Sequence, residues 1–156
     1  MTQRWCVPET ILFETEQAFR RGAHEVFVMW AAPCPANGAQ VSISRCVVPE
    51  QRAGKTALGV YVHIEGAELS RIQVENFRKR ERSAVQLHTH PGANVEMSEL
   101  DREWEVVAHV GALSIIVPYY GRYGLRGFPG ANVYEREQHD WRLWSVEEAQ
   151  SRLVTQ

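Results

Sequence analysis

Apolar residues recur at helical spacing along several parts of the chain. The pattern predicts helices over residues 8–21, 66–82, 98–109 and 145–153. On the first helix one face carries the apolar set Ile11, Leu12, Thr15, Ala18 and Phe19. On the second helix, which is highly charged, we expect Leu69, Ile72 and Phe77 to lie on the inner side.

Short apolar or alternating runs between these helices predict strands. They cover residues 25–32, 41–48, 58–64, 83–90 and 113–117, with one or two edge strands between 133 and 144. Residues 50–56 are polar, and residues 121–132 hold four glycines and a proline, so we expect both segments to be loops. Because helices and strands interleave, the pattern favours a layered α/β structure around one sheet. It is not a Rossmann pattern, because no glycine-rich turn follows the first strand.

Length and composition indicate one compact domain over residues 1–156. Of these residues 44% are hydrophobic and 23% are charged, which excludes a disordered chain and a fibrous repeat. The net charge of −2 gives no general attraction to nucleic acid or to an anionic membrane. The chain shows neither a signal peptide at residues 1–8 nor an apolar stretch of about 18 residues that could cross a bilayer. We therefore expect a cytoplasmic protein that binds neither nucleic acid nor membrane.

The cysteines and tryptophans carry little functional signal. The three cysteines show no CxxC spacing, which argues against both a disulfide framework and a four-thiolate zinc site. Trp104, Trp141 and Trp144 are expected to pack in the core or at sheet edges rather than to form a ligand cage.

One segment, residues 86–101, concentrates residues with metal-binding chemistry. His88 and His90 are two positions apart in a predicted strand, so both imidazoles leave the same face of the sheet. Asp101 follows after ten intervening residues, in the first turn of the third predicted helix, where the connecting loop can fold it back over the strand. Two imidazoles and one carboxylate form a three-ligand set for zinc that leaves a fourth position for water. The alternative is a structural histidine pair at a strand end beside an ordinary helix-capping acid.

This pattern, His88-x-His90-x10-Asp101 with Pro91 after the second histidine and Ser98 three residues before the aspartate, resembles the signature of the JAMM (also JAB or MPN-plus) zinc metalloproteases. The family pattern also has a glutamate near the start of an early strand that follows the first helix, and Glu25 stands there. The order of elements over most of the chain is similar too. The size of the chain is most similar to small stand-alone bacterial members of the family.

The resemblance implies a JAMM/MPN, cytidine-deaminase-like layered fold with one mixed central sheet flanked by helices. It also implies Zn²⁺ held by His88, His90 and Asp101, with Glu25 as general acid and base. Ser98 would donate a hydrogen bond to the developing oxyanion, although a role as helix N-cap competes for the same oxygen.

The assignment of Glu25 has competitors. Many bacterial relatives follow their glutamate with a Cys-Gly or Gly-Leu-Leu-Gly stretch, which residues 26–32 of this chain lack. Three other glutamates, Glu9, Glu14 and Glu16, lie on or before the first predicted helix, but no strand directly follows them.

The resemblance further implies a peptidase or isopeptidase that cuts after the C-terminal tail of a ubiquitin-like protein, in precursor processing or deconjugation. Small bacterial members occur beside E1-like and E2-like enzymes, which would be partners here, and several of those systems are antiviral. Two alternatives are a noncatalytic MPN scaffold and a JAMM peptidase of a sulfur-carrier or cell-wall pathway. A deaminase is disfavoured because the chain lacks a Pro-Cys-x-x-Cys pair. The glycine-rich loop at residues 121–132, with Tyr119 and Tyr120, is either a wall of the substrate groove, with the loop as a lid that orders on binding, or a solvated connection.

Overall fold

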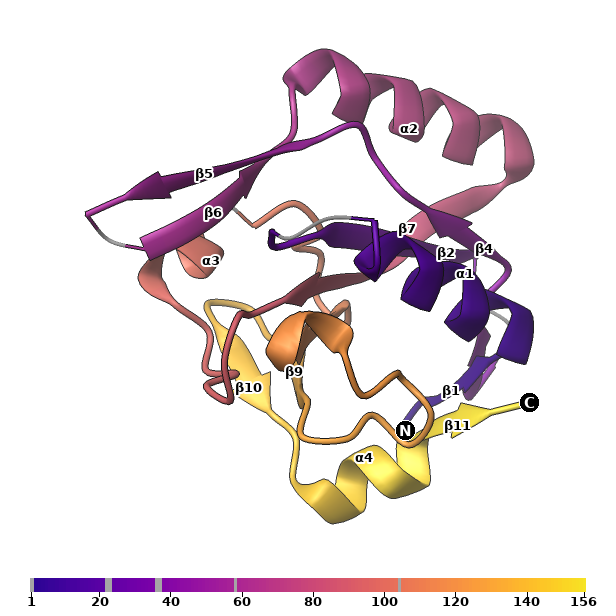
Figure 1. Ribbon diagram of the computed structural model, residues 1–156. Coiled ribbons are helices and arrows are strands. Elements are labelled where there is room, and N and C mark those ends of the chain that lie inside the picture. Colours follow the sequence, from indigo (N-terminus) through magenta and orange to yellow (C-terminus); the bar gives the residue numbers. More distant parts are fainter. Residues whose placement is uncertain (1, 22–23, 36–37, 58, 104) are drawn as a thin grey trace.

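The centre of the computed structural model is a six-stranded mixed sheet (Figure 1). The structure describes residues 2–21, 24–35, 38–57, 59–103 and 105–156. In spatial order the sheet contains β10 (Trp141–Leu143), β9 (Asn132–Arg136), β8 (Leu113–Val117), β7 (Glu81–Thr89), β2 (Phe27–Pro33) and β4 (Arg45–Val47). The β7–β8 pair is parallel and the other pairs are antiparallel. The expected mixed central sheet is therefore present.

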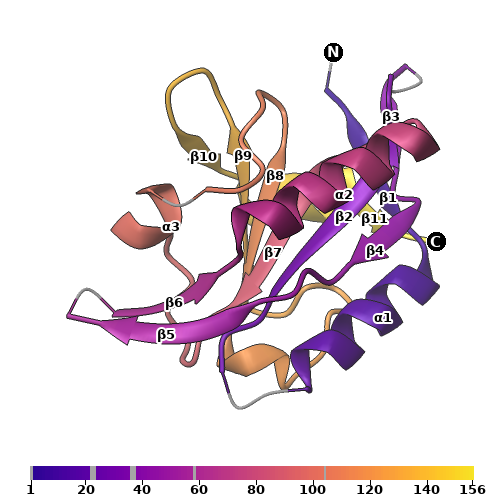
Figure 2. The same ribbon diagram turned by 90° about the horizontal axis from the view of Figure 1, so that it is seen from above.

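Helices cover both faces of this sheet. They are α1 (Glu9–Phe19), α2 (Gly66–Lys79), α3 (Glu99–Glu103) and α4 (Val146–Arg152), with a 3-10 turn η1 (Tyr119–Gly121). Alternate residues of β2 point to opposite faces. Val28 and Trp30 join the α1 side of the core, whereas Phe27 and Met29 pack on the other side with Ile72 of α2. Figure 2 shows α2 crossing over β2 and β7 on that second face. The buried face predicted for α1 is confirmed residue by residue.

Two smaller sheets flank the central one. Strands β11 (Leu153–Thr155), β1 (Arg4–Val7) and β3 (Gln40–Ser42) form a parallel sheet in which both ends of the chain take part. Strands β5 (Arg52–Thr56) and β6 (Gly59–His63) form a separate antiparallel hairpin. This hairpin extends from the body of the molecule on the side of α2 and α3 (Figures 1 and 2).

One strand prediction and one loop prediction are wrong. Residues 41–48 form two strands in different sheets, because Ile43 donates its N–H to Cys6 while Ser44 donates to Ala31. The chain crosses between the two sheets at that point. The polar pattern of residues 50–56 predicts a loop, but Arg52–Thr56 is strand β5. Its residues are polar because the hairpin lies outside the core, so no apolar period marks it.

Two helix predictions also need correction. The helix expected over residues 98–109 ends at Glu103, and the N–H groups of Val106 and Val107 donate instead to the side-chain oxygen of Gln86. Phe77, expected on the inner side of α2, is 84% exposed. The inward position is taken by its neighbour Asn76, which hydrogen-bonds Arg45 and Ser83.

The tryptophan expectation is confirmed for Trp141 and Trp144, which are both buried. Trp104 lies outside the described residues. Within the part of the chain that the structure describes, no helix has the length and apolarity needed to cross a membrane.

Candidate metal centre

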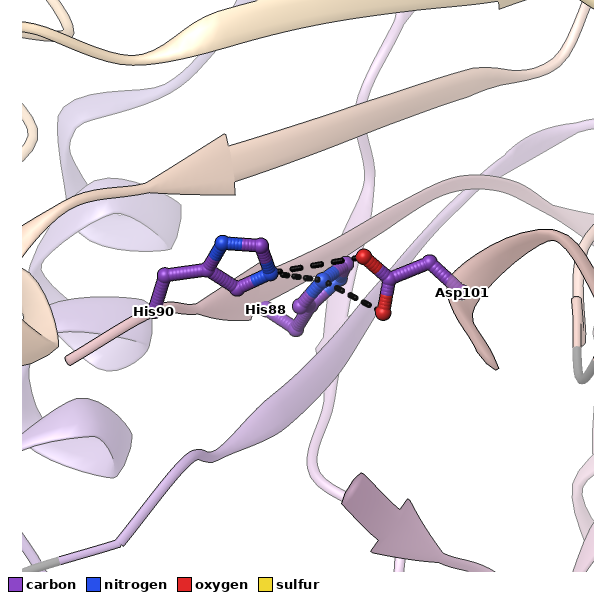
Figure 3. Close-up of side chains that lie close together, drawn as sticks. All are labelled: His88, His90 and Asp101. Atoms are coloured by element: carbon purple, nitrogen blue, oxygen red, sulfur yellow. Dashed lines mark hydrogen bonds and ion pairs between the residues drawn. The ribbon is translucent and has the colours of Figure 1, made fainter. Parts of the chain in front are cut away.

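Strand β7 positions the two histidines. His88 lies in register between Phe27 of β2 and Ile116 of β8, so it projects from the middle of the central sheet. His90 follows the last residue of the strand, and its N–H donates to the carbonyl of Val117. Because they are two residues apart, both imidazoles point to the face of the sheet that α2 covers. Asp101 approaches them from α3, as Figure 3 shows.

The three side chains meet at ligand distances. Nε2 of His88 is 3.1 Å from Nε2 of His90, and it is 3.2 Å from Oδ1 of Asp101. Nε2 of His90 is 3.3 Å from Oδ2 of Asp101 (Figure 3). Ligand atoms bound tetrahedrally at 2.0–2.1 Å from one zinc ion lie about 3.3 Å apart. The three groups are therefore close enough to share a single small cation, and among the described residues they form the one such cluster of histidine, cysteine and acidic side chains.

Neighbouring groups orient both imidazoles. Nδ1 of His90 is 2.8 Å from the carbonyl oxygen of Asn94, so this nitrogen carries a hydrogen, and in the neutral ring Nε2 holds the lone pair that a metal ion would bind. A carbonyl partner of this kind is the usual support of a metal-binding histidine. The ring of His88 stacks on Phe27, with the ring centres 6.4 Å apart and the planes at 12°.

A reciprocal capping box places Asp101. The N–H of Ser98 donates to Oδ2 of Asp101 at 2.9 Å, and the N–H of Asp101 donates to Oγ of Ser98 at 3.0 Å. The N-cap role considered for Ser98 is thus confirmed. Accepting this bond uses one lone pair of the hydroxyl, and its hydrogen can still donate to another oxygen. The two roles considered for Ser98 are therefore compatible.

The electrostatics of the cluster favour a charged carboxylate between the imidazoles. Burial alone would raise the pKa of Asp101, but hydrogen bonds to His88 and His90 hold that pKa far below its usual range. Burial would likewise lower the pKa of His90, yet its bonds to Asp101 and to the Asn94 carbonyl raise it. The carboxylate of Asp101 thus favours positive charge at the centre of the cluster, and a bound cation would supply such a charge.

Glu25 lies beside this cluster. It precedes β2, is only 7% exposed, and shares a cavity with His88 and Asp101. Burial raises its pKa, and the nearby histidines only partly oppose this. The competing glutamates (Glu9, Glu14 and Glu16) belong to α1, which packs on the opposite face of the sheet, and none of them lines this cavity.

The cavity itself has a volume of about 460 Å³. Its walls come from β6, the start of α2, α3 and the segment after α3, with Val62, Leu69, Leu100 and Val106 among the apolar residues. Neither Tyr119 and Tyr120 nor residues 121–132 line it. That loop instead packs toward α1, where Leu125 is buried and Gly121 lies against Phe19. Residues of β6, and not this loop, form a wall of the cavity.

Sequence reasoning missed most of the residues that line the cavity, among them the polar residues Gln86 and Glu105. Gln86 is buried and lines the cavity, accepts the N–H groups of Val106 and Val107, and donates to Ser114. The sequence did contain a signal for Gln86. A glutamine inside an apolar strand, two residues before His88, must point to the same face of the sheet as His88. Glu105 also lines the cavity and accepts from the indole N–H of Trp141. No pattern in the sequence distinguishes it from a surface glutamate.

One comparison with known proteins bears on the function of the chain. No protein-family model matches the chain. Over 99 residues the chain is 30% identical to the probable metalloprotease y4jG of Sinorhizobium fredii, a stretch that covers 64% of this chain and 59% of that protein. The chain thus matches well under two thirds of the relative's length. The solution structure of protein DSY2949 from Desulfitobacterium hafniense superimposes with a TM-score of 0.63 over 97% of this chain and 92% of that one. At 10% identity, that similarity shows a shared fold alone.

Proposed function

We propose that this protein is a zinc-dependent peptidase of the JAMM type, with the JAMM/MPN fold, that acts on the C-terminal tail of a ubiquitin-like protein. The observation that carries this proposal is the convergence of His88, His90 and Asp101 beside the buried Glu25 at one cavity. The stretch that is 30% identical to a probable metalloprotease supports the hydrolytic class.

The residues of the site would have three separate roles: metal binding, proton transfer and stabilisation of the carbonyl oxygen. His88, His90 and Asp101 would hold Zn²⁺, which when bound polarises a substrate carbonyl and lowers the pKa of a water molecule. Glu25 would accept a proton from the attacking water and return it to the leaving amine. Ser98, whose hydroxyl hydrogen remains able to donate, would stabilise the carbonyl oxygen as it gains negative charge.

An extended peptide suits the shape of the site. Extended tails bind sheet edges through backbone hydrogen bonds, with alternate side chains in pockets. The β5–β6 hairpin is the small sheet that borders the cavity, and Val62 and His63 of β6 line it. A tail laid along the hairpin would bring its last carbonyl to the cluster.

The biological setting follows from the family resemblance. We propose precursor processing or deconjugation of a ubiquitin-like protein in the cytoplasm, with E1-like and E2-like proteins of the same system as partners. A role in antiviral defence is the corresponding hypothesis for the pathway.

The decisive experiment combines metal analysis with cleavage of ubiquitin-like fusions. The wild-type protein should contain about one zinc per chain and lose activity when a chelator removes it. Glu25→Gln should keep the metal but lower kcat by about 10²–10⁴-fold, because the proton acceptor is lost. Glu14→Gln, an exposed glutamate of α1, is the matched control and should cut at the wild-type rate.

Other outcomes of this experiment would favour the alternative functions. A Glu25→Gln variant that still cuts at the normal rate would remove Glu25 from the mechanism. Zinc-loaded protein that ignores ubiquitin-like fusions but cuts short peptides would point to a sulfur-carrier or cell-wall pathway. Zinc binding without any hydrolysis would indicate a noncatalytic scaffold.

A further inference from the structure

The segment between the proposed ligands has little rigidity of its own. His88 and His90 are held by β7, but Asp101 lies on α3, a helix of only five residues. Helices this short are not stable alone, because one turn cannot offset the cost of nucleation. Residues 91–98, which join His90 to α3, form neither helix nor strand. The position of Asp101 therefore depends on what anchors this connection.

One hydroxyl lies at the centre of that anchor. Oη of Tyr134 accepts the N–H of Met97 at 3.1 Å and the side-chain amide of Asn132 at 3.1 Å. It also donates to the carbonyl of Val95 at 3.4 Å, to which the Asn132 amide donates as well, at 3.1 Å. A phenolic hydroxyl has one hydrogen and two lone pairs, and all three are used here.

The base of this anchor is rigid. Tyr134 belongs to β9 and is paired with Ser114 of β8 and Leu143 of β10, so its backbone is fixed on both sides. Its ring is 6% exposed and packs with Met97, Ile116 and Trp141. The hydroxyl is thus held by the same sheet that carries the histidines.

The anchor acts immediately before the capping box. Met97, whose N–H is bound by Tyr134, is followed directly by Ser98, and Ser98 makes both hydrogen bonds that place Asp101. The N–H of Met97, which Tyr134 binds, is thus only one peptide unit away from the N–H of Ser98, which orients the Asp101 carboxylate. The other ties of this region lie farther from Ser98 in sequence. The carbonyls of Asn94 and Gly92 bind Nδ1 of His90 and the N–H of Tyr119 at the start of the connection, and Arg102 binds Asp140 and Glu105 binds Trp141 beyond Asp101.

We propose that Tyr134, with Asn132, is a positioning residue that pre-organises the metal site by holding the connection between its second and third ligands. The proposal rests on the proposed metal site. Tyr134 does not touch the ion. It sets the distance between Asp101 and the two imidazoles, so its hydroxyl contributes to metal affinity as well as to folding.

The test is the zinc affinity of Tyr134→Phe, which removes the hydroxyl and keeps the ring. Titration of the metal-free protein against a chelator of known affinity should show a Kd about tenfold weaker than wild type, the lower end of what outer partners of metal ligands contribute. The matched control is Thr15→Val, because the Thr15 hydroxyl is also fully buried and bonds Trp30 and the Ile11 carbonyl on the opposite face. It should lower the melting temperature but leave the zinc Kd unchanged.

Each result bears on the proposal. A Tyr134→Phe protein that binds zinc like wild type overturns it, and so does a Thr15→Val protein that loses affinity to the same degree. If Tyr134→Phe does not fold, Asn132→Ala removes the second half of the anchor and should weaken zinc binding several-fold, whereas an unchanged Kd contradicts the inference. Wild-type protein that binds no zinc overturns the proposed function, and this inference with it. Normal zinc binding by the wild type with no effect of either variant overturns the inference alone.

Discussion

Among single residues, Ser98 carries the largest number of assigned tasks. Its N–H and its Oγ close the capping box with Asp101, and its hydroxyl hydrogen is the proposed donor to the substrate oxygen. A serine can do both because a hydroxyl accepts and donates at once. The two roles differ in energy. A lost N-cap costs about 1 kcal/mol of stability, whereas a lost oxyanion donor costs about 3 kcal/mol of activation energy.

Replacement of Ser98 by glycine should separate these roles. Glycine is a fair N-cap, so Ser98→Gly should change the free energy of unfolding by only a few tenths of a kcal/mol. It has no hydroxyl, so kcat should fall by about 10²–10³-fold. Urea titration and steady-state kinetics measure the two effects. The same change at Ser145, the N-cap of α4 that accepts the Glu148 N–H, should leave kcat as it is. A Ser98→Gly protein that keeps the wild-type kcat would leave Ser98 with the capping role alone.

At the level of elements, the β5–β6 hairpin is the part of the site that differs most from expectation. Its strands pair with each other, outside the central sheet, yet β6 forms a wall of the cavity. Gly54 of β5 is packed beneath the ring of Tyr61 of β6, and Tyr61 also lines the cavity. An aromatic ring over a cross-strand glycine is a known way to stabilise such a pair.

Gly54→Ala should therefore alter the groove without unfolding the protein. A Cβ at this position would lie 2.2 Å from Cζ of Tyr61, so the ring must swing away. We expect KM for a tail substrate to rise about fivefold, which corresponds to about 1 kcal/mol of binding energy, with kcat little changed. Gly66→Ala is the control, because nothing lies within 4 Å of its added methyl group. The same KM in both variants would show that the hairpin does not bind substrate.

At the level of the whole molecule, a charged network ties the C-terminal part of the chain to the rest. Glu148 of α4 binds Arg142 of β10 and Arg152, and Arg152 also donates to the carbonyl of Gln3 near β1. Hydrogen bonds from Arg142, and then from Arg152, lower the pKa of Glu148 to about 2. Glu135 of β9 also pairs with both arginines, so residues distant in sequence share these two carboxylates.

This network predicts a pH-dependent stability. The folded state holds the pKa of Glu148 below its unfolded value of about 4.3. The contribution of Glu148 to the free energy of unfolding is therefore present above about pH 4.3 and is lost as the pH falls toward 2. Glu148→Gln should be up to about 1 kcal/mol less stable than wild type at pH 7, and the difference should shrink as the pH falls from about 4.5 toward 2. Urea unfolding at several pH values measures it, with the exposed Glu147→Gln as control. A difference that stays constant with pH would contradict the assignment.

Much of the fold and of the candidate site follows from local patterns in the sequence. These patterns predict strand β8 at its observed bounds and α1 with its buried face, because local apolar periods reflect which side of each element meets the core. The spacing of His88, His90 and Asp101 likewise depends on local geometry, since strand alternation and a helix N-terminus place these side chains within a short stretch of chain.

Features that depend on contacts between distant segments do not follow from such patterns. Residues 41–48 divide between two sheets because Ile43 and Ser44 find partners in different ones, and β5 becomes a strand because β6 pairs with it. Tyr134 lies 37 residues beyond Met97, so no spacing pattern marks their hydrogen bond. The local sequence specifies the ligand types and the elements that present them. The packing of the chain supplies the cavity wall, the neighbours of Glu25 and the anchor of the connecting loop, because these arise from pairings that local periodicity does not encode.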